Sequence, residues 1–256
     1  MQQFAGAKRP RRETSMRRVA EHLLGMAGFQ VSRTIDSYAD LARVLKGHEI
    51  TAIVDGGAAK GTETARLAEL FPNASVYAFE PHPRAFSRLQ TQFKEGGRIR
   101  LFPVAISDSV GNTTLHLSAK PTQTSLLKPI DPKMMNVGSV DVEVTTLARM
   151  IESKAVEKPQ LLKLDLQGAE LGALRGMDGY MADVLAVLVE VSFRNRYAGG
   201  CLYHEVAAEL HRSNLRLYRF SDVHAHATGA WVRADAIFLR GEMLDHLLEG
   251  ANELTS

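Results

Sequence analysis

The sequence predicts an α/β fold built on a mostly parallel sheet, with helices on both faces and an antiparallel pair of strands at its end. Apolar strand patterns alternate with helix patterns along most of the chain, which is typical of parallel sheets connected by helices. Residues 184–191 are almost continuously apolar, as expected for a strand buried on both faces. The last two strand patterns, 215–220 and 233–239, have no helix between them, so we expect them to pair antiparallel.

The strongest local pattern is an apolar strand from Thr51 that runs through Asp55 into a glycine loop, followed by a helix at 62–71. Glycines in such a loop permit tight turns and close approach of a ligand, and the start of the helix directs free N–H groups toward it. A carboxylate directly before the loop repels a pyrophosphate and attracts a cationic amine or sulfonium. Asp55 therefore favours a ligand with a positive charge.

A second acid supports this interpretation. The strand pattern at 75–79 ends in Glu80, the place where such folds put a carboxylate on a ribose diol. Together with Asp55, it predicts a nucleoside with a positively charged end.

The remaining elements follow from periodicity, capping and turn residues. Helices are expected at 13–26, 36–46, 84–94, 168–175, 203–212 and 242–248, and strands at 99–105, 113–117, 140–145 and 160–165. We expect 113–117 and 140–145 to pair as an antiparallel extension. Residues 118–139 between them contain three prolines and Gly138, and we interpret this long segment as a substrate lid.

Composition limits the classes of protein to consider. The chain has 256 residues, of which 45% are hydrophobic and 23% charged, which suits one large α/β domain. Since no apolar run approaches the roughly 20 residues that span a bilayer, and the basic N-terminus lacks an apolar signal region, we expect a cytoplasmic protein without a membrane span. Cys201 is the only cysteine, so an intrachain disulfide or thiolate metal cluster is excluded, and no metal site is predicted.

The N-terminus is strongly basic. Residues 1–18 hold six Lys or Arg against Glu13, a local balance of +5, whereas the whole chain has a net charge of +2. We interpret 1–18 as a flexible arm and 19–48 as helices packed on a domain at 49–256. Contact of the arm with RNA or an anionic membrane is the alternative. A nucleic-acid partner is disfavoured because the basic charge is not spread over the body of the protein.

Six short motifs occur in order between residues 50 and 240. They are Val54-Asp55-Gly56-Gly57-Ala58 with Gly61, Tyr77-Ala78-Phe79-Glu80-Pro81, Val104-Ala105-Ile106-Ser107-Asp108 with Gly111, Thr124-Ser125-Leu126, Leu162-Lys163-Leu164-Asp165-Leu166-Gln167-Gly168-Ala169-Glu170, and Val189-Glu190-Val191. In this order they resemble the FkbM family of class I S-adenosylmethionine-dependent methyltransferases. The resemblance implies a Rossmann-like, seven-stranded sheet with an antiparallel last strand, bound S-adenosylmethionine, and O-methylation of a sugar or another small hydroxylated molecule.

The resemblance also implies a set of cofactor-binding residues: Asp55, Gly57, Ala58, Gly61, Glu80, Pro81, His82, Ser107 and Asp108. The loop glycines would line the methionine end, and Asp55 would face its ammonium directly or through water. Glu80 would accept from the ribose hydroxyls. Asp108, with Ser107 beside it, would accept from the exocyclic amine of the adenine.

Asp165 is expected at the transfer site, because it ends the fourth strand beside the cofactor's expected methyl group; its alternative role is the N-cap of the next helix. Glu190 ends the fifth strand and is a candidate second base, with a structural role as the alternative. Ser125 and Gln167 are expected to contact substrate. Methyl transfer is an in-line displacement, so the enzyme mainly positions the acceptor, and a base matters only if the acceptor must lose a proton.

Two positions depart from the family pattern. Family members usually have asparagine where this chain has Ala59, which removes a side-chain hydrogen bond near the cofactor. They usually have glutamate where Gln167 stands, and the lost charge would alter substrate choice or make a hydroxyl harder to ionise. A non-catalytic descendant is therefore one alternative. Four late aromatic residues either form a sugar-stacking wall or pack against the last strands: Tyr197, Tyr203, Tyr218 and Trp231.

Other functions stay open from the sequence. A nicotinamide-dependent oxidoreductase shares the glycine loop and the ribose acid, but should lack Asp55 and the terminal antiparallel pair. A third hypothesis is a protein with the methyltransferase fold that binds cofactor or substrate without turnover, or whose basic arm contacts RNA. Methylation of base amino groups is disfavoured, because those enzymes commonly carry Asn or Asp followed by Pro-Pro and an aromatic residue where Asp165-Leu166-Gln167-Gly168 stands here. A homo-oligomer is left open.

Overall fold

The computed structural model describes residues 36–94, 96–131 and 134–253 of the chain. The expected basic arm and the expected helix at 13–26 lie outside these ranges. Helix α2 (Ser37–Val44) begins after Asp36, whose carboxylate accepts from the backbone N–H groups of Tyr38 and Ala39. This confirms Asp36 as the predicted N-cap.

The main sheet has seven strands in the order β3-β2-β1-β7-β8-β10-β9. These strands are β1 (Ala52–Gly56), β2 (Ser75–Phe79), β3 (Ile99–Phe102), β7 (Leu161–Leu164), β8 (Ala186–Ser192), β9 (Leu215–Ala225) and β10 (Trp231–Arg240). Strand β10 is antiparallel to both of its neighbours, whereas the other pairs are parallel, as predicted. The chain order reverses between β1 and β7, and open α/β sheets bind ligands beyond the carboxyl ends of strands at such a point.

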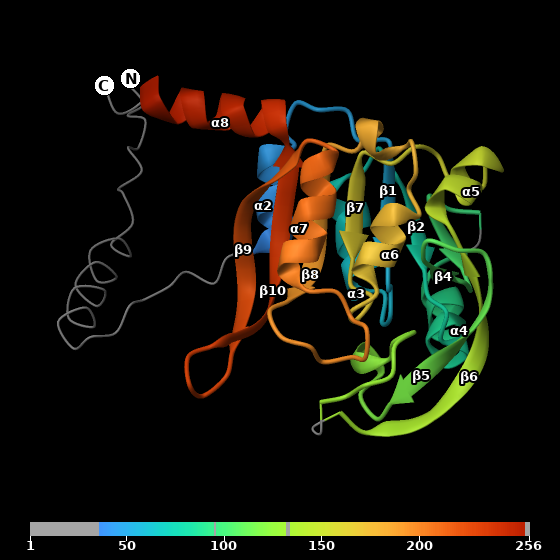
Figure 1. Cartoon of the computed structure of the whole chain (residues 1–256). Helices are drawn as coiled ribbons and strands as arrows, with labels where there is room; N and C mark the ends of the chain where they lie inside the picture. The colour runs from blue at the N-terminus through green and yellow to red at the C-terminus, as the bar shows by residue number, and fades with distance from the viewer. Residues whose placement is uncertain (1–35, 95, 132–133, 254–256) are drawn as a thin grey trace, which may run out of the picture. The chain divides into compact units, whose positions relative to one another are not determined.

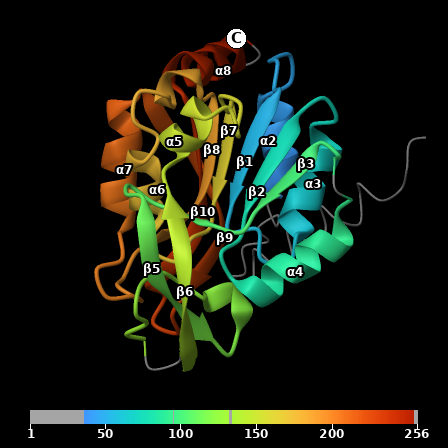
Figure 2. The same ribbon diagram turned by 90° about the vertical axis from the view of Figure 1, so that its right-hand side faces the viewer.

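Helices cover both faces of this sheet (Figure 2). They are α3 (Thr62–Leu70), α4 (Pro83–Gln92), α5 (Leu147–Glu152), α6 (Glu170–Arg175), α7 (Tyr203–Arg212) and α8 (Gly241–Glu253). Helices α5, α6 and α7 pack in one hydrophobic cluster with Phe79 and Leu162, and helices α2, α3 and α8 pack in another with Ile53 and Ile237. Alternate residues of the strands face the two clusters, which is why the central strands are apolar throughout.

A smaller sheet extends the domain. Strand β5 (Gly111–Ser118) pairs antiparallel with β6 (Asn136–Thr145), which confirms the predicted extension, and β4 (Ala105–Ile106) adds parallel to β6. The short 3₁₀ helix η1 (Pro121–Gln123) follows β5, and this part of the chain lies beyond the carboxyl ends of β1 and β7 (Figure 1). The expected lid therefore begins at the edge of the sheet where ligands bind.

Several boundaries differ from the prediction. The strand expected at 99–105 is divided, because Pro103 lacks a backbone N–H and the chain crosses there from the main sheet to the small one. Strands β9 and β10 are longer than expected, and helix α5 and the 3₁₀ helix η2 (Met181–Asp183) were not predicted because they are too short to show a period. Within the described ranges, no helix has both the length and the hydropathy to cross a bilayer.

Candidate active site

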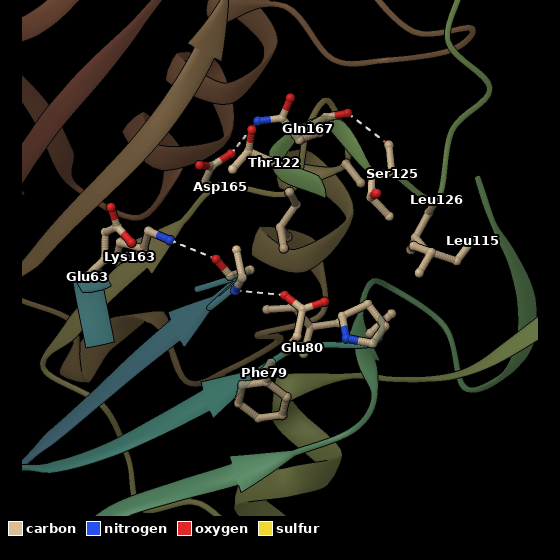
Figure 3. A pocket seen from close by; sticks show the side chains of 18 of the residues that line it. Glu63, Phe79, Glu80, Leu115, Thr122, Ser125, Leu126, Lys163, Asp165 and Gln167 are labelled. Carbon is tan, nitrogen blue, oxygen red and sulfur yellow. Dashed lines mark hydrogen bonds between the residues drawn. The ribbon is translucent and has the colours of Figure 1, made fainter. Parts of the chain in front are cut away.

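A pocket lies where β1, β2 and β7 end, under residues of the segment that follows β5 (Figure 3). Its carboxylates come from Glu63, Glu80 and Asp165, and its basic groups from Lys60 and Lys163. Its apolar lining comes from Phe79, Pro81, Val104, Ala105, Ile106, Leu115, Leu126 and Leu166. The pocket therefore combines an apolar wall, suited to a flat ring, with carboxylates that suit hydroxyls or a positive charge.

The glycine loop approaches Asp165 very closely at Gly57. Gly57 has a φ of 80°, and a Cβ built there would lie 2.1 Å from the backbone oxygen of Asp165. Only glycine fits this conformation and this contact. The loop thus brings the end of β1 against the end of β7 and lines the pocket at that point.

Two other residues of this loop serve packing. Gly61 also has a positive φ, but a Cβ there would lie 2.7 Å from Leu89 and Phe93, so glycine permits α3 to approach α4. Ala58 is fully buried and packs against Ala78 and Leu89. Neither residue lines the pocket, which corrects the expectation that both contact the cofactor.

Glu80 projects into the pocket with both oxygens held by backbone. Its Oε2 accepts from the N–H of Ala59 at 2.7 Å and its Oε1 accepts from the N–H of His82 at 2.8 Å. Burial raises the pKa of Glu80, and these two N–H groups oppose that effect. Pro81 lines the pocket beside it, whereas the His82 ring turns away and caps α4 by accepting from the N–H of Arg84.

Ala59, one of the two departures from the family pattern, lies in the left-handed region with a φ of 47°. Asparagine adopts this conformation more readily than alanine. The Ala59 backbone nevertheless donates to Glu80, so the contact that orients this acid needs no side chain at position 59.

Asp55 is not in the pocket, which corrects the expectation that it faces the ammonium of the cofactor. Its carboxylate is fully buried, with Oδ1 3.0 Å from Nζ of Lys163 and Oδ2 accepting from the hydroxyl of Thr64. Burial by itself lowers the pKa of Lys163, but Asp55 and then Asp165 raise it above its ordinary value. Lys163 also donates to the backbone oxygen of Gly57 at 3.0 Å, so the pair holds the loop in place.

Glu63 lines the pocket, whereas Asp55 does not, and the sequence prediction did not include Glu63. It stands in the first turn of α3 and is labelled in Figure 3. The signal was present in the sequence, because an acid in the first helical turn after a glycine loop faces the same space as the N–H groups of that turn.

Asp165 is in the pocket, directly after β7. Its Oδ1 accepts from Nε2 of Gln167 at 2.6 Å. The N-cap of α6 is Ala169, and the N–H groups of Leu166 and Gly168 donate to Glu170. The alternative role of Asp165 as a helix cap is therefore wrong.

Glu190 lies behind Asp165 and is 7% exposed. Its Oε1 accepts from Arg233, and its Oε2 accepts from Nε2 of Gln167 at 2.9 Å and lies 3.7 Å from Nη1 of Arg196. Burial, followed by the charge of Asp165, raises its pKa above the ordinary value. Glu190 does not line the pocket and its oxygens are engaged, so the structure favours the structural role over that of a second base.

The segment after β5 is tied to the loop after β7. Ser125 is 2% exposed, donates through Oγ to the backbone oxygen of Gln167 at 2.9 Å, and accepts from the N–H of Leu127. Its hydroxyl is thus engaged, although the residue lines the pocket as expected. Thr122 and Thr124 also line the pocket. Thr124 belongs to the Thr124-Ser125-Leu126 motif, whereas Thr122 has no signal beyond its place in the expected lid.

Two further groups of expected residues lie elsewhere. Ser107 and the exposed Asp108 line a separate cavity near α6, not the pocket, so the structure does not place Asp108 beside an adenine there. The late aromatic residues follow the packing alternative. Tyr203 and Trp231 contact Phe193 and Phe220, with ring centroids 5.2 to 5.7 Å apart. The other two are also placed by protein contacts: Tyr197 donates to Gln167, and Tyr218 accepts from Arg43.

Comparison with known proteins agrees with this geometry. The family model described as "Methyltransferase FkbM domain" matches residues 55–220. The chain is 28% identical over 159 residues to the 2-O-methyltransferase NoeI of Sinorhizobium fredii, which covers 57% of this chain and 65% of that protein. It is 27% identical over 165 residues to the hexuronic acid methyltransferase AglP of Haloferax volcanii, which covers 62% and 64%. The chain thus spans just under two thirds of the length of these relatives.

Replacement of Gly57 by alanine tests the close approach of the loop to β7. We expect Gly57→Ala to lower the free energy of unfolding by roughly 2–5 kcal/mol, because left-handed strain adds to an overpacked contact. Gly47→Ala is the matched control, since Gly47 has a φ of 91° with nothing within 4 Å of its Cβ position. Urea unfolding followed by circular dichroism measures both, and equal losses would contradict the contact.

Removal of the buried cation tests the Asp55–Lys163 pair. We expect Lys163→Met to cost about 3–5 kcal/mol, because it leaves the Asp55 carboxylate buried without a counter-charge. Adding Asp55→Asn to this variant should recover much of the loss, since the uncompensated charge is then gone. The same urea unfolding experiment measures this, and a double variant no more stable than Lys163→Met alone would refute the explanation.

Proposed function

The chain belongs to the FkbM methyltransferase family, and from this premise we propose that it transfers a methyl group from S-adenosylmethionine to a hydroxyl of a sugar or another small molecule. The observation that carries the proposal is the pocket at the carboxyl edge of the sheet, which holds Glu80 and Asp165 together. Family membership favours this reaction over hydride transfer with a nicotinamide cofactor.

The residues of the pocket fit S-adenosylmethionine. Each Glu80 oxygen receives one backbone N–H and keeps further acceptor capacity, which suits two ribose hydroxyls. Phe79, Val104 and Ile106 supply an apolar wall for the purine. Three carboxylates line the pocket against two lysines, Lys60 and Lys163, and the surplus of negative charge suits a cation. When bound, S-adenosylmethionine supplies an electrophilic methyl group on a positively charged sulfur.

The chain's own contribution is to position the acceptor and hold its proton. The Asp165 carboxylate would accept the proton of the acceptor hydroxyl, since Oδ1 is fixed by Gln167 and the residue faces the pocket. Leu115 and Leu126 line the pocket with apolar side chains, which would limit the water it holds. Holding that oxygen at attack distance is the larger part of the catalysis expected for an in-line displacement.

The acceptor class rests on the site and on the relatives. Thr122 and Thr124 line the pocket with hydroxyl groups, which suit a molecule rich in hydroxyls. The relatives are named for methylation at a 2-O position and of a hexuronic acid. A small carbohydrate is therefore the acceptor class we propose.

Variants of Glu80 and Asp108 test whether the cofactor binds in the pocket, because Glu80 lines it and Asp108 does not. We expect Glu80→Gln to weaken binding of S-adenosylmethionine at least tenfold, because the amide cannot accept through both positions. Asp108→Asn, on an exposed acid outside the pocket, should change the affinity less than twofold. Calorimetric titration measures both, with S-adenosylhomocysteine and NAD as comparison ligands. Binding of NAD without binding of either adenosyl ligand would refute the proposal.

Asp165→Asn tests the chemical step. We expect it to lower the turnover number by roughly 10²–10⁴, because the amide cannot accept the proton, while the affinity for S-adenosylmethionine stays near that of the unaltered chain. Transfer of a radiolabelled methyl group to a panel of glycosides and uronic acids measures turnover. Cofactor binding with no transfer to any member of the panel would instead indicate a binding protein or a different acceptor class.

A further inference from the structure

Gln167 is unusually well held for a polar side chain beside a pocket. It is 6% exposed, and its Nε2 donates to Oδ1 of Asp165 at 2.6 Å and to Oε2 of Glu190 at 2.9 Å. Its Oε1 accepts from the hydroxyl of Tyr197 at 2.8 Å. Because carboxylates only accept hydrogen bonds, the amide nitrogen must face the two acids and the oxygen must face the tyrosine.

We infer that Gln167 is a positioning residue: its amide donates one N–H to Asp165 and the other to Glu190, and so fixes the Asp165 carboxylate at the pocket. The inference rests on the proposed function, in which Asp165 accepts a proton from the acceptor. Gln167 itself touches neither the acceptor nor the cofactor in this role.

The need for such a residue follows from the charges. Asp165 and Glu190 share one nitrogen as donor, so their bound oxygens lie within two hydrogen-bond lengths of each other. Like charges so close disfavour double ionisation, and burial with the charge of Asp165 raises the pKa of Glu190 to about 8. Donated N–H groups oppose this effect because they stabilise the charged form of a carboxylate. The two N–H groups of one amide meet this need without adding charge.

Other charged groups lie near Asp165 and Glu190. Arg233 from β10 and Arg196 from the segment after β8 face Glu190 and compensate its charge. The ionisable groups on which Asp165 acts electrostatically are Lys163 on β7, Glu170 on α6, Asp235 on β10 and the Tyr197 hydroxyl. Of these neighbours only Lys163 carries a positive charge, so Gln167 is the neutral donor that binds Asp165 among acids and a phenol.

The backbone holds the amide in this place. Gln167 has a φ of 53° and is followed by Gly168 with a φ of 97°, so the loop is in the left-handed region at both residues. The Gln167 carbonyl accepts from Ser125 and the Gly168 N–H donates to Glu170 (Figure 3 draws the first of these bonds). A conformation that glutamine rarely adopts is therefore stabilised from two sides, which is expected where the position of a side chain matters.

A glutamate at this position has the same shape but the opposite effect. It removes both donated N–H groups and adds a third carboxylate to the group. We expect Gln167→Glu to raise the pKa of Asp165 by about one unit or more. Gln167→Met removes the donors without adding charge, and should raise it by a smaller amount.

The measurement is a pH titration of the full chain with ¹³C-labelled aspartate and glutamate carboxyls, followed by NMR. The Asp165 signal is assigned by its loss in Asp165→Asn. Gln90→Glu is the matched control, since it adds the same charge at an exposed position of α4 and should leave the Asp165 titration unchanged because solvent and salt screen it. Circular dichroism checks that each variant folds.

The titration of Asp165 in the two Gln167 variants decides whether the inference holds. If Asp165 titrates at the same pH in Gln167→Glu and Gln167→Met as in the unaltered chain, the inference is overturned. Should Gln167→Glu fail to fold, Gln167→Met alone decides, because it shifts the titration in the same direction. The titration needs neither cofactor nor acceptor, so its result holds even if no methyl transfer is detected. A failure to detect methyl transfer would count against the proposed function and not against the role of Gln167.

Once an acceptor is known, turnover gives a second readout. Only the Asp165 carboxylate accepts a proton, so activity falls as the pH drops below its pKa. A raised pKa in Gln167→Glu should therefore move the acid limb of the pH profile upward by the same amount as the NMR titration. A lower rate with an unmoved acid limb would indicate a structural role only.

Discussion

The buried pair of Asp55 and Lys163 is the interaction on which the site depends. The two residues are direct neighbours on the parallel strands β1 and β7, at the point where the strand order reverses. Lys163 also binds the Gly57 carbonyl, and Asp55 binds the Thr64 hydroxyl in the first turn of α3. One ion pair thus joins two strands, the glycine loop and the following helix. Pairing and hydrogen bonds offset the cost of burying both charges, and the loop is held where it meets Asp165.

This arrangement explains why the sequence predicted the ligand class from a residue that does not contact the pocket. An acid directly before a glycine loop predicts a positively charged ligand, but the cation that pairs with Asp55 is Lys163 of the protein itself. The pattern Leu162-Lys163-Leu164 gave no sign of the pairing, because register between strands distant in sequence is not visible from either strand alone. The acid of this part of the chain that lines the pocket is Glu63, in the first turn of α3.

The fold was predictable to a large extent because it depends on local patterns. Apolar runs such as β8, the Asp36 cap and the absence of a helix between β9 and β10 gave the order of elements and the reversed last strand. Boundaries and short elements were less predictable, as Pro103 and α5 show. Glu80 and Asp165 line the pocket, and their place was predictable because each directly follows a strand. Gly61, Ala58 and Asp108 do not line it, since packing against another element decides which side of a loop faces the pocket.

The two departures from the family pattern have different physical consequences in this fold. At Ala59 the loss is small, because the bond that orients Glu80 comes from the backbone, and the remaining cost is that of alanine in a left-handed conformation. At Gln167 the exchange of a carboxylate for an amide changes what the loop offers, from an acceptor to two donors. Both donors have acceptors within hydrogen-bond distance, and the amide oxygen has Tyr197. A neutral residue thus satisfies its surroundings where a third acid would add to the repulsion between Asp165 and Glu190. The departure therefore leaves Asp165 hydrogen-bonded at the pocket and gives no reason to regard the chain as inactive.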